Sequence, residues 1–410
     1  MSYKLAVACL LSTAAMYMQL PVLTAMFGSV SIGYTPMQEA AVLAMPGAGV
    51  FAFGCFCSYL VQHYRRNMVC IMALLLLALC SYALYYLLEN VLSPSGSGKS
   101  GLLAATGCAG LGLLLVVRFV QGAVFGLAQM VLASTLVIDT CNSPRRTAAN
   151  QTAAWFARFA LVLGPMLVLF LSRFSGTVSS VGSSLLGFSA GVSLFKSGMF
   201  ASVALCVLAA LLVMSVRFPF KAPEDIVPHV STDRFFLKDG VQLFVNFALV
   251  SATVGVLLCV DCTMHFYVML MLGLFAALLA ERFFLSGRGH SGVAQAGMLV
   301  IFVATGMSML DGVAVKWCVS LLFGCGLGLS GARFLSLFIT LSPHCRRGTA
   351  QSTFFLSWEF GLYAGVFLAC GVQSYDNDGY MSKLATVFSF AALTMFCWIT
   401  RKWYVRHKNR

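Results

Sequence analysis

Two stretches of this chain resemble each other closely: Ser143–Thr152, with the sequence SPRRTAANQT, and Ser342–Thr353, with the sequence SPHCRRGTAQST. Aligning Arg145 with Arg346 gives an offset of 201 residues (346 minus 145), about half of the 410-residue chain. Each stretch stands directly before a long apolar run. Because internal repeats are typical of membrane transporters, this repeat predicts two similar halves, each with a basic loop before an equivalent helix.

Composition indicates a membrane protein. Hydrophobic residues make up 60% of the sequence and charged residues 10%, and the mean hydropathy is +0.90, which is not typical of a water-soluble domain. The apolar runs are long enough to cross a hydrocarbon core of ~30 Å as helices of ~20 residues. A membrane β-barrel would need short alternating segments instead, and the sequence lacks them.

The apolar runs predict an all-α polytopic protein with twelve transmembrane helices. A polar stretch with several prolines, FKAPEDIVPHVSTDR, separates two six-helix bundles, residues 1–218 and 235–410, so that residues 219–234 form a cytoplasmic linker. The expected spans are 5–27, 38–61, 68–88, 108–138, 151–172, 197–217, 240–259, 263–282, 294–311, 317–341, 350–372 and 382–400.

Lysine and arginine indicate the orientation, since cytoplasmic loops carry the excess of positive charge. With the N-terminus inside, the outer loops hold few of the 26 basic residues, namely Lys99, Arg173, Lys196, Lys316 and Lys383. Both termini are therefore expected in the cytoplasm. The net charge of +13 follows from this topology and needs no nucleic-acid partner, and the basic tail RKWYVRHKNR can contact anionic lipids. A cleaved signal in the first helix is the alternative, but its loss would leave an odd number of helices.

The fifteen cysteines are mostly single residues inside apolar spans, where a thiol behaves as a small hydrophobic group. One cluster, CVDCTMH, combines Cys259, Asp261, Cys262 and His265 at an outer turn. Its spacing could hold a metal ion or a disulfide, but a single CxxC without a second pair is a weak signal. We therefore expect no metal site and no cofactor.

The loop after the second helix is the first of several elements that resemble the major facilitator superfamily. That family has a glycine, an aspartate and a basic cluster there; in this chain Ser58 and Gln62 replace the first two, and Arg65 and Arg66 keep the basic cluster. The resemblance extends over essentially the whole chain. It implies a monomer that works by alternating access and binds its substrate near the midplane.

Two further elements lie in the fourth and fifth helices. The segment RFVQGAVFG (118–126) resembles the family's Arg-x-x-Gln-Gly element, whose arginine is associated with proton transfer, here Arg118. Gly164-Pro165 resembles the core of the family's antiporter motif, without the flanking glycines. The resemblance is to the bacterial efflux-type branch.

Basic residues in such loops can hydrogen-bond the carbonyl ends of neighbouring helices and separate when the two halves rock. Topology signalling by positive charge is an alternative that does not exclude this role. We expect conformational gating at Arg65, Arg66, Asp139, Arg145, Arg146, Gly164, Pro165, Glu281, Arg282, Arg346 and Arg347.

Four charged residues fall deep inside predicted helices, away from the helix ends: Arg118, Arg158, Arg333 and Glu359. A charge at the bilayer centre costs ~2.5–3.5 kcal/mol on insertion scales, so each is a functional candidate. The offset of 201 takes Arg158 to Glu359, which places opposite charges at equivalent positions of the two halves. We expect both to face a central cavity without bonding to each other. Alternatively, each pairs within its own bundle, Arg158 with Gln121 or Gln129 and Glu359 with Arg333.

Three arginines against one glutamate favour an anionic substrate, because the guanidinium is a planar fork of donors that matches a carboxylate or phosphate. Glu359 is the only carboxylate predicted deep in the membrane, so coupling to a proton gradient would pass through it, together with Arg118. The aromatic and amide neighbours suit an amphiphilic solute. The expected substrate contacts are Arg158, Arg333, Trp155, Trp358, Tyr17, Gln19 and Asn246.

These features predict a secondary active transporter of the plasma membrane, specifically a bacterial inner membrane, that exports an amphiphilic organic anion with proton coupling. A multidrug exporter of lipophilic cations is an alternative, although the first and fourth helices lack the acidic residue expected for it. An importer or uniporter of a polar metabolite, or a receptor on the same fold, also stays open. An enzyme is not expected, because the six histidines lie mostly in loops and the tail, without paired carboxylates.

Overall fold

The computed structural model describes residues 2–29, 34–92, 107–137, 146–179, 188–216, 228–232, 234–260, 263–285, 287–343, 346–372 and 379–408. Within these ranges every regular element is a helix. The first half contains α1 (Ser2–Tyr17), α2 (Gln19–Ser29), α3 (Pro36–His63), α4 (Arg66–Leu92), α5 (Gly107–Val131), the π-helical segment η1 (Leu132–Leu136), α7 (Arg146–Ser179) and α8 (Phe188–Met214). The second half contains the short η3 (Lys238–Gly240), α9 (Val241–Val260), α10 (Met264–Phe283), α11 (His290–Met307), α12 (Val313–Leu341), α13 (Arg347–Val372), α14 (Tyr380–Met395), the π-helical segment η6 (Phe396–Thr400) and α15 (Arg401–His407).

The described residues include twelve spans long and apolar enough to cross a membrane, which confirms the predicted number. The first span joins α1 to α2, and the last runs from α14 through η6 into α15. Several predicted spans differ at their ends: the fourth ends at Val131 rather than 138, and the tenth begins at Val313 rather than 317. The ninth begins at His290, because Gly289 ends the preceding turn and caps α11. The twelfth continues to His407, because η6 prolongs the helix past residue 400.

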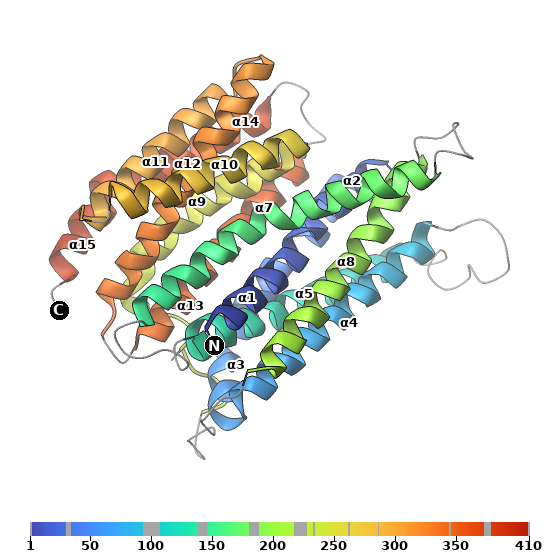
Figure 1. Ribbon diagram of the computed structural model, residues 1–410, viewed down its shortest axis with the longest axis horizontal. Coiled ribbons are helices and arrows are strands. Elements are labelled where there is room, and N and C mark those ends of the chain that lie inside the picture. The colour runs from blue at the N-terminus through green and yellow to red at the C-terminus, as the bar shows by residue number, and fades with distance from the viewer. Residues whose placement is uncertain are drawn as a thin grey trace.

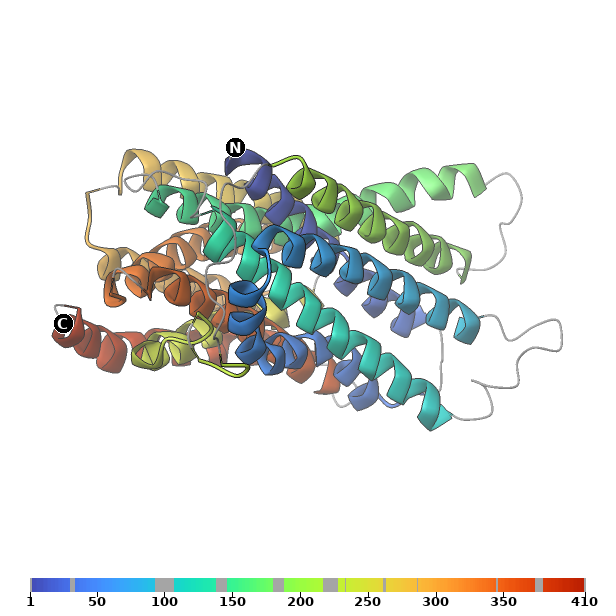
Figure 2. The same ribbon diagram turned by 90° about the horizontal axis from the view of Figure 1, so that it is seen from below.

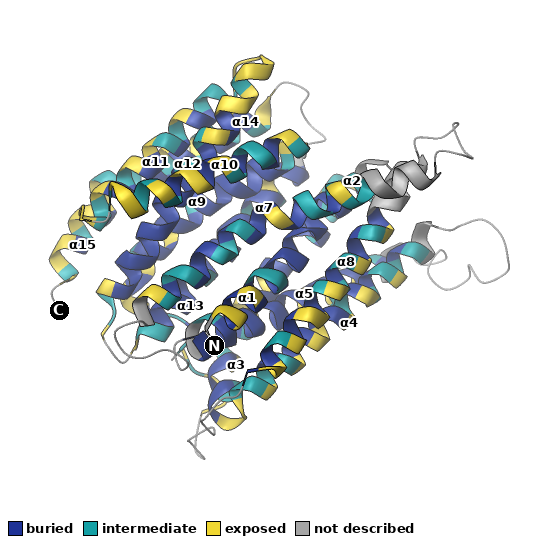
Figure 3. Ribbon diagram, viewed as in Figure 1, coloured by how far each residue is buried: buried dark blue, intermediate teal, exposed yellow. Residues whose placement is uncertain are grey.

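The helices form two bundles, α1 to α8 and α9 to α15 (Figure 1). Both chain ends lie at one end of the molecule, which we call the termini face; the opposite end is the distal face (Figures 1 and 2). Exposed residues line the outer sides of the bundles, whereas buried residues face inward (Figure 3). Many of the exposed side chains are large and apolar, for example Leu79, Leu211 and Phe275. The protein is therefore a multi-pass integral membrane protein.

The predicted linker, 219–234, lies partly outside the described residues, and so does its boundary with the first bundle. Its described end contacts both bundles at the termini face. The amide of Ser231 donates to the carbonyl of Cys55 (3.1 Å), and the amide of Arg234 donates to Thr349 Oγ1 (3.1 Å).

Two prolines shape the helices near the centre of the first bundle. A proline lacks the amide hydrogen that would bond the carbonyl four residues earlier, and its ring clashes with that carbonyl. Pro21 therefore breaks the first span after Tyr17, where α1 ends. Pro46 leaves the carbonyl of Val42 without its partner inside α3. The Tyr17 hydroxyl and the Val42 carbonyl both take part in the buried hydrogen bonds described below.

The bundles meet along two seams. In one, α13 packs on α3, and Gly47 makes room for Tyr363, since an added Cβ would lie 2.6 Å from the Tyr363 Cβ. In the other, α7 packs on α10 and α12, and the side-chain amide of Gln151 donates to Ser336 Oγ (3.2 Å) near the termini face. The α3–α13 seam extends to the distal face, where Gly371 faces Met37 and Ala40.

Candidate functional site

Arg158 and Glu359 lie at matching depths in the two bundles. α7 begins at Arg146 and α13 at Arg347, which are separated by the same offset of 201 residues. Each charged residue follows its helix start by about twelve residues, or ~18 Å, which is near the middle of a ~30 Å hydrocarbon core. Both side chains are buried, with 3% of Arg158 and 1% of Glu359 exposed.

Glu359 links the two bundles through Tyr17. The Tyr17 hydroxyl, on α1, donates to Glu359 Oε1 (2.5 Å), and the indole N–H of Trp358 donates to the same hydroxyl (2.7 Å). Glu359 Oε2 is buried without a hydrogen-bond partner among the residues that the structure describes. The carboxylate therefore has one oxygen held by the opposite bundle and one that can take a proton or a ligand.

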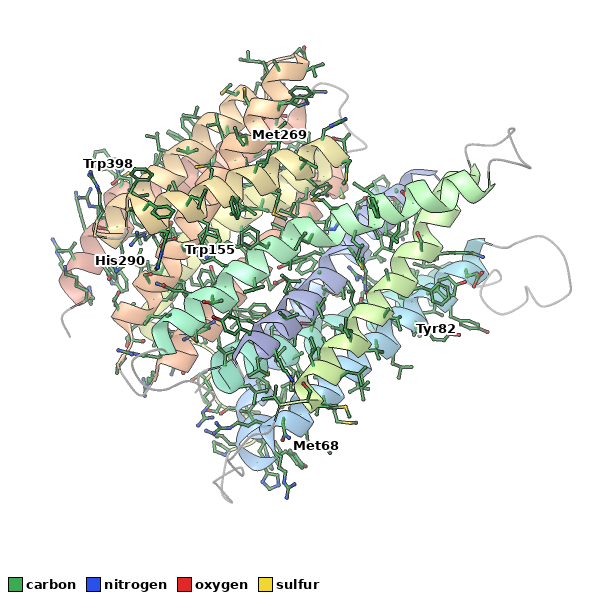
Figure 4. All side chains as sticks on the ribbon, viewed as in Figure 1. Met68, Tyr82, Trp155, Met269, His290 and Trp398 are labelled. Carbon is green, nitrogen blue, oxygen red and sulfur yellow. The ribbon has the colours of Figure 1, made fainter. Side chains whose placement is uncertain are left out.

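Arg158 projects from α7 against the second bundle. Its guanidinium lies 5.0 Å from the centre of the Trp155 ring and 5.9 Å from that of Phe354. Gly331 on α12 makes this position possible, because an added Cβ there would lie 2.5 Å from Arg158 Nε. Neither Nη1 nor Nη2 hydrogen-bonds to any described residue, although both are buried. Trp155 lies where α7 passes the second bundle (Figure 4).

Aromatic rings fill the space between these two charges. Phe247 of α9 stacks on Phe354, with ring centres 4.8 Å apart, and its ring centre lies 5.8 Å from that of Trp358. We call Phe354, Phe247 and Trp358 the aromatic strip. It begins at Arg158 and ends at Trp358, next to Glu359. The structure shows no ion pair between Arg158 and Glu359; whether both face a central cavity stays a prediction.

Arg118 has a different environment, inside the first bundle. Its Nη1 donates to Gln19 Oε1 (2.9 Å) and Gln121 Oε1 (2.7 Å). Its Nε donates to the carbonyl of Val42 (3.0 Å), the group that Pro46 leaves without a helical partner. The guanidinium is completely buried. A proline in one helix thus creates the acceptor for an arginine in another.

The Arg118 cluster continues through Gln19. The Nη2 of Arg118 donates to the carbonyl of Leu43 (3.2 Å), and Gln19 Nε2 donates to the hydroxyls of Ser81 (3.0 Å) and Ser202 (2.9 Å). Gln19, predicted to bind substrate, is instead engaged within the first bundle. The alternative pairing of Arg158 with Gln121 is not found, because Gln121 belongs to this cluster.

Arg333 belongs to a third cluster, at the end of α10. Its Nη2 donates to the carbonyl of Leu285 (2.6 Å), Nη1 hydrogen-bonds His290 Nδ1 (2.9 Å), and Nε lies 3.4 Å from Glu281 Oε1. Figure 4 shows His290 near the end of the second bundle. The structure thus joins Arg333 to Glu281, rather than to Glu359 as the pairing alternative required. Its donors hold the connection between α10 and α11.

Asn246 is buried in the second bundle, where its Nδ2 donates to the carbonyl of Ala392 (2.9 Å). Its Oδ1 has no partner within the described part of the chain. Gly164 brings α7 close to α1, because an added Cβ would lie 2.6 Å from the carbonyl oxygen of Ala14. Together with Pro165, which lies inside α7, it therefore supports the helix that presents Tyr17.

The predicted gating residues in the loops, where the structure describes them, lie at the termini face. Arg65 and Arg282 are exposed, and Arg346 lines a pocket of about 360 Å³ together with Lys238 and Asp239. Arg66 is half-buried and Arg347 Nε is buried without a hydrogen-bond partner among the described residues. Asp139 and Arg145 lie outside the described residues, and only the backbone of Arg146 is described.

A second pocket, of about 460 Å³, opens at the distal face of the second bundle beside Lys316, His265 and Trp317. None of the described polar atoms that line it is buried without a hydrogen-bond partner. Arg158 and Glu359 both have such atoms, so their position between the bundles is the stronger candidate for binding a polar ligand.

Three contributors were not predicted from the sequence. Phe247, Phe354 and Gly331 are common residue types in this chain, and nothing in their immediate sequence distinguishes them. One weak signal was present, since Phe354 and Trp358 are four residues apart and must share a helix face. The contribution of Gly331 depends on contact between helices far apart in sequence.

No protein-family model and no curated protein sequence matches this chain. Solved structures do match it over nearly the full length. The inward-open xylose transporter XylE from E. coli aligns with a TM-score of 0.68 and 14% identity, covering 97% of this chain and 95% of that one. A bacterial homologue of the iron transporter ferroportin, in an outward-facing state, aligns with a TM-score of 0.65 and 14% identity, covering 98% of each chain.

The fucose:proton symporter FucP from E. coli aligns with a TM-score of 0.59 and 16% identity over 100% of this chain and 98% of that one. A further XylE structure that matches is described as a major facilitator superfamily symporter. At these identities the likeness concerns the fold. With twelve spans in two bundles and this likeness along the whole chain, the protein has the fold of the major facilitator superfamily.

Proposed function

We propose that the protein is a secondary transporter that exports a small amphiphilic organic anion by alternating access, with a proton as the coupling ion. The observation that carries this proposal is the guanidinium of Arg158, which is buried between the two bundles while Nη1 and Nη2 have no partner among the described residues.

An anionic substrate follows from the cost of burying such a group. A charge held away from water is expensive unless it is paired, and arginine binds carboxylates and phosphates through two parallel hydrogen bonds. The two terminal nitrogens of Arg158 are the pair that such a bond uses. Glu281 acts on Arg158 only through its charge, and its Oε1 lies 3.4 Å from Arg333 Nε. A carboxylate, sulfonate or phosphate on the substrate would therefore supply the acceptors that Arg158 Nη1 and Nη2 lack.

The two end rings of the aromatic strip, Phe354 and Trp358, would supply the surface for the apolar part of the substrate, since each is 8% exposed whereas Phe247 between them is fully buried. The strip begins beside Arg158 and consists of rings with centres 4.8 to 5.8 Å apart. Flat aromatic faces accept apolar groups of varied shape without hydrogen-bond demands. A substrate with an anionic end and an aromatic or aliphatic body fits this arrangement better than a sugar, whose hydroxyls would meet few partners.

Proton coupling is assigned to Glu359 at the other end of the strip. Its Oε2 is available for a proton, and Oε1 is held across the bundle contact by Tyr17. A change in the charge of Glu359 alters this inter-bundle hydrogen bond, since bonds to a charged acceptor are stronger than neutral ones. Protonation of Glu359 thus weakens the Tyr17–Glu359 contact between the bundles, which must break and re-form during alternating access.

Alternating access requires the contacts at the termini face to separate. The Gln151–Ser336 hydrogen bond and the packing of Arg158 against Gly331 join the bundles in this conformation. Both must break when the other side opens. We assign the basic residues at the termini face, including Arg346 and Arg347, and the cluster of Arg333 with Glu281 to control of this step, and not to substrate binding.

Export is favoured by the Gly164-Pro165 pair, which resembles the antiporter motif and supports the α1–α7 contact. A second candidate function is export of a lipophilic cation. It is favoured by one observation, the partner-free oxygen of Glu359 beside the rings of Tyr17 and Trp358, because aromatic rings and a carboxylate together attract cations.

The test is transport by the protein reconstituted in vesicles that carry an internal pH-sensitive dye. For the wild type we expect an aromatic carboxylate to move against its gradient when a pH gradient is imposed, with matching proton movement. Glu359→Gln should lose the proton movement and the accumulation but keep downhill exchange. Glu39→Gln, a half-buried carboxylate at the start of α3, is the matched control. Accumulation of cations but not anions would instead establish the second candidate.

A further inference from the structure

The distal ends of α9 and α13 bring two cysteines together. Cys370 Sγ lies 3.5 Å from Cys259 Sγ, although the residues are 111 positions apart in sequence. Cys259 is half-buried and Cys370 is buried, with 8% exposed. Cys259 is also the first cysteine of the CxxC pattern in the sequence, whose second cysteine, Cys262, lies outside the described residues.

The close approach of the two helices explains why the thiols meet. At Gly255 of α9 an added Cβ would lie 2.1 Å from the carbonyl oxygen of Leu362, and at Gly365 of α13 it would lie 2.1 Å from that of Ala252. Small residues of this kind let membrane helices touch along their backbones. Cys259 lies one turn beyond Gly255, so the thiols extend the same contact towards the distal face.

We propose that Cys259 and Cys370 form a disulfide that ties α9 to α13 at the distal face. Disulfides persist in oxidising compartments, and the distribution of basic residues predicts that the distal face is the outer one. Two cysteines on adjacent, closely packed helices can reach bonding distance with a small side-chain movement, since bonded sulfurs lie ~2.05 Å apart.

The chemistry is thiol–disulfide exchange with an oxidised dithiol of the outer compartment. The thiolate of the more exposed Cys259 attacks the oxidant's disulfide, forming a mixed disulfide and releasing one oxidant thiol. Cys370, after losing its proton, attacks Cys259 Sγ and releases the second. The two cysteines lose two protons and two electrons, and the oxidant disulfide becomes two thiols.

The bond would fix the helix that carries Glu359 next to a bundle contact. Gly371, adjacent to Cys370, faces Met37 and Ala40 of α3, since an added Cβ would lie 3.3 Å from the Met37 Sδ. Because α9 and α13 belong to the same bundle, the disulfide would restrain α13 without linking the two bundles. It is therefore compatible with alternating access.

In the test, acid stops thiol–disulfide exchange in native membranes and the free thiols are then alkylated. The peptides are identified by mass spectrometry without reductant. We expect one linked species that joins the peptides of Cys259 and Cys370, two hydrogens lighter than the pair of thiols. Cys259→Ser should make Cys370 available for alkylation. Cys325→Ser, at a partly buried cysteine in α12, is the matched control and should leave the linked species unchanged.

A second measurement adds oxidised glutathione to the purified protein. If both cysteines react with the alkylating reagent in membranes and still do so after the glutathione treatment, the proposed disulfide is wrong. Linkage with glutathione but not in membranes would confirm the geometry and overturn the outer location. Because these outcomes do not depend on transport, they are separate from any failure of the proposed function.

Discussion

Two buried arginines of the same bundle differ in how their donors are used. Arg118 makes hydrogen bonds from all three of its nitrogens, every acceptor lying in the first bundle. Arg158 has two terminal nitrogens without a partner among the described residues and contacts the second bundle through Gly331. Equally buried arginines therefore differ in how far their hydrogen bonds are satisfied: Arg118 is bonded within its own bundle, whereas the donors of Arg158 are left for the substrate that we propose.

The largest expected difference between the two arginines is their contribution to the stability of the folded protein. Arg118→Ala would leave the carbonyls of Val42 and Leu43 and part of Gln121 without a donor. At about 1 kcal/mol or more for each buried group left unsatisfied, the loss is on the order of 3 kcal/mol. Arg158→Ala removes no hydrogen bond that the structure shows. We expect thermal unfolding of the purified protein to show a clear fall in midpoint for Arg118→Ala and a small change for Arg158→Ala; the reverse order would break the comparison.

The next effect concerns the space that Arg158 occupies. Gly331→Ala places a Cβ 2.5 Å from the present position of Arg158 Nε, and overpacking of this kind costs about 1–3 kcal/mol. We expect substrate affinity to fall about tenfold or more with the protein still folded. Gly306→Ala is the matched control, because no atom lies within 4 Å of its added Cβ among the described residues. Equal affinity in both variants would show that Arg158 does not depend on Gly331.

The smallest effect concerns one hydroxyl group. Tyr17→Phe removes the hydrogen bond to Glu359 and the acceptor for Trp358, which stabilise this bundle contact by about 1 kcal/mol, or roughly a fivefold change in its equilibrium. We expect the rate of substrate exchange in vesicles to change by a few-fold. Tyr363→Phe is a precise control, since the Tyr363 hydroxyl has no hydrogen-bond partner in the described structure. A similar change in both variants would mean that the Tyr17 bond plays no part.

The fold could be predicted from the sequence because its main determinants are local or repeated. Hydrophobic runs determine the number of spans, and the basic repeat relates α7 to α13, so that Arg158 and Glu359 were placed at matching depths. The partners of these residues were less predictable. Whether a buried arginine is satisfied depends on carbonyls made available by Pro46, in another helix, and on amides such as Gln19.

Arg333 illustrates the same limit. Its sequence position, inside an apolar run, is equivalent in kind to that of Arg158, and both were expected to bind substrate. The structure shows Arg333 bound to Glu281, His290 and the carbonyl of Leu285. These acceptors come from the end of α10, the turn after it and the start of α11, so no periodicity or spacing in the chain could have separated the two arginines.

The most direct test of the central claim is ligand-dependent thermal stability of the purified protein. A ligand that binds only the folded state stabilises it by RT ln(1 + [L]/Kd), about 2.7 kcal/mol at a hundred times Kd. Aromatic carboxylates and sulfonates would be compared with their neutral amides and with quaternary ammonium ions, in the wild type, Arg158→Ala and Arg158→Lys. We predict that anions alone raise the midpoint, that Arg158→Ala abolishes the shift, and that Arg158→Lys keeps part of it. A shift that survives in Arg158→Ala, or that only cations produce, would contradict the account.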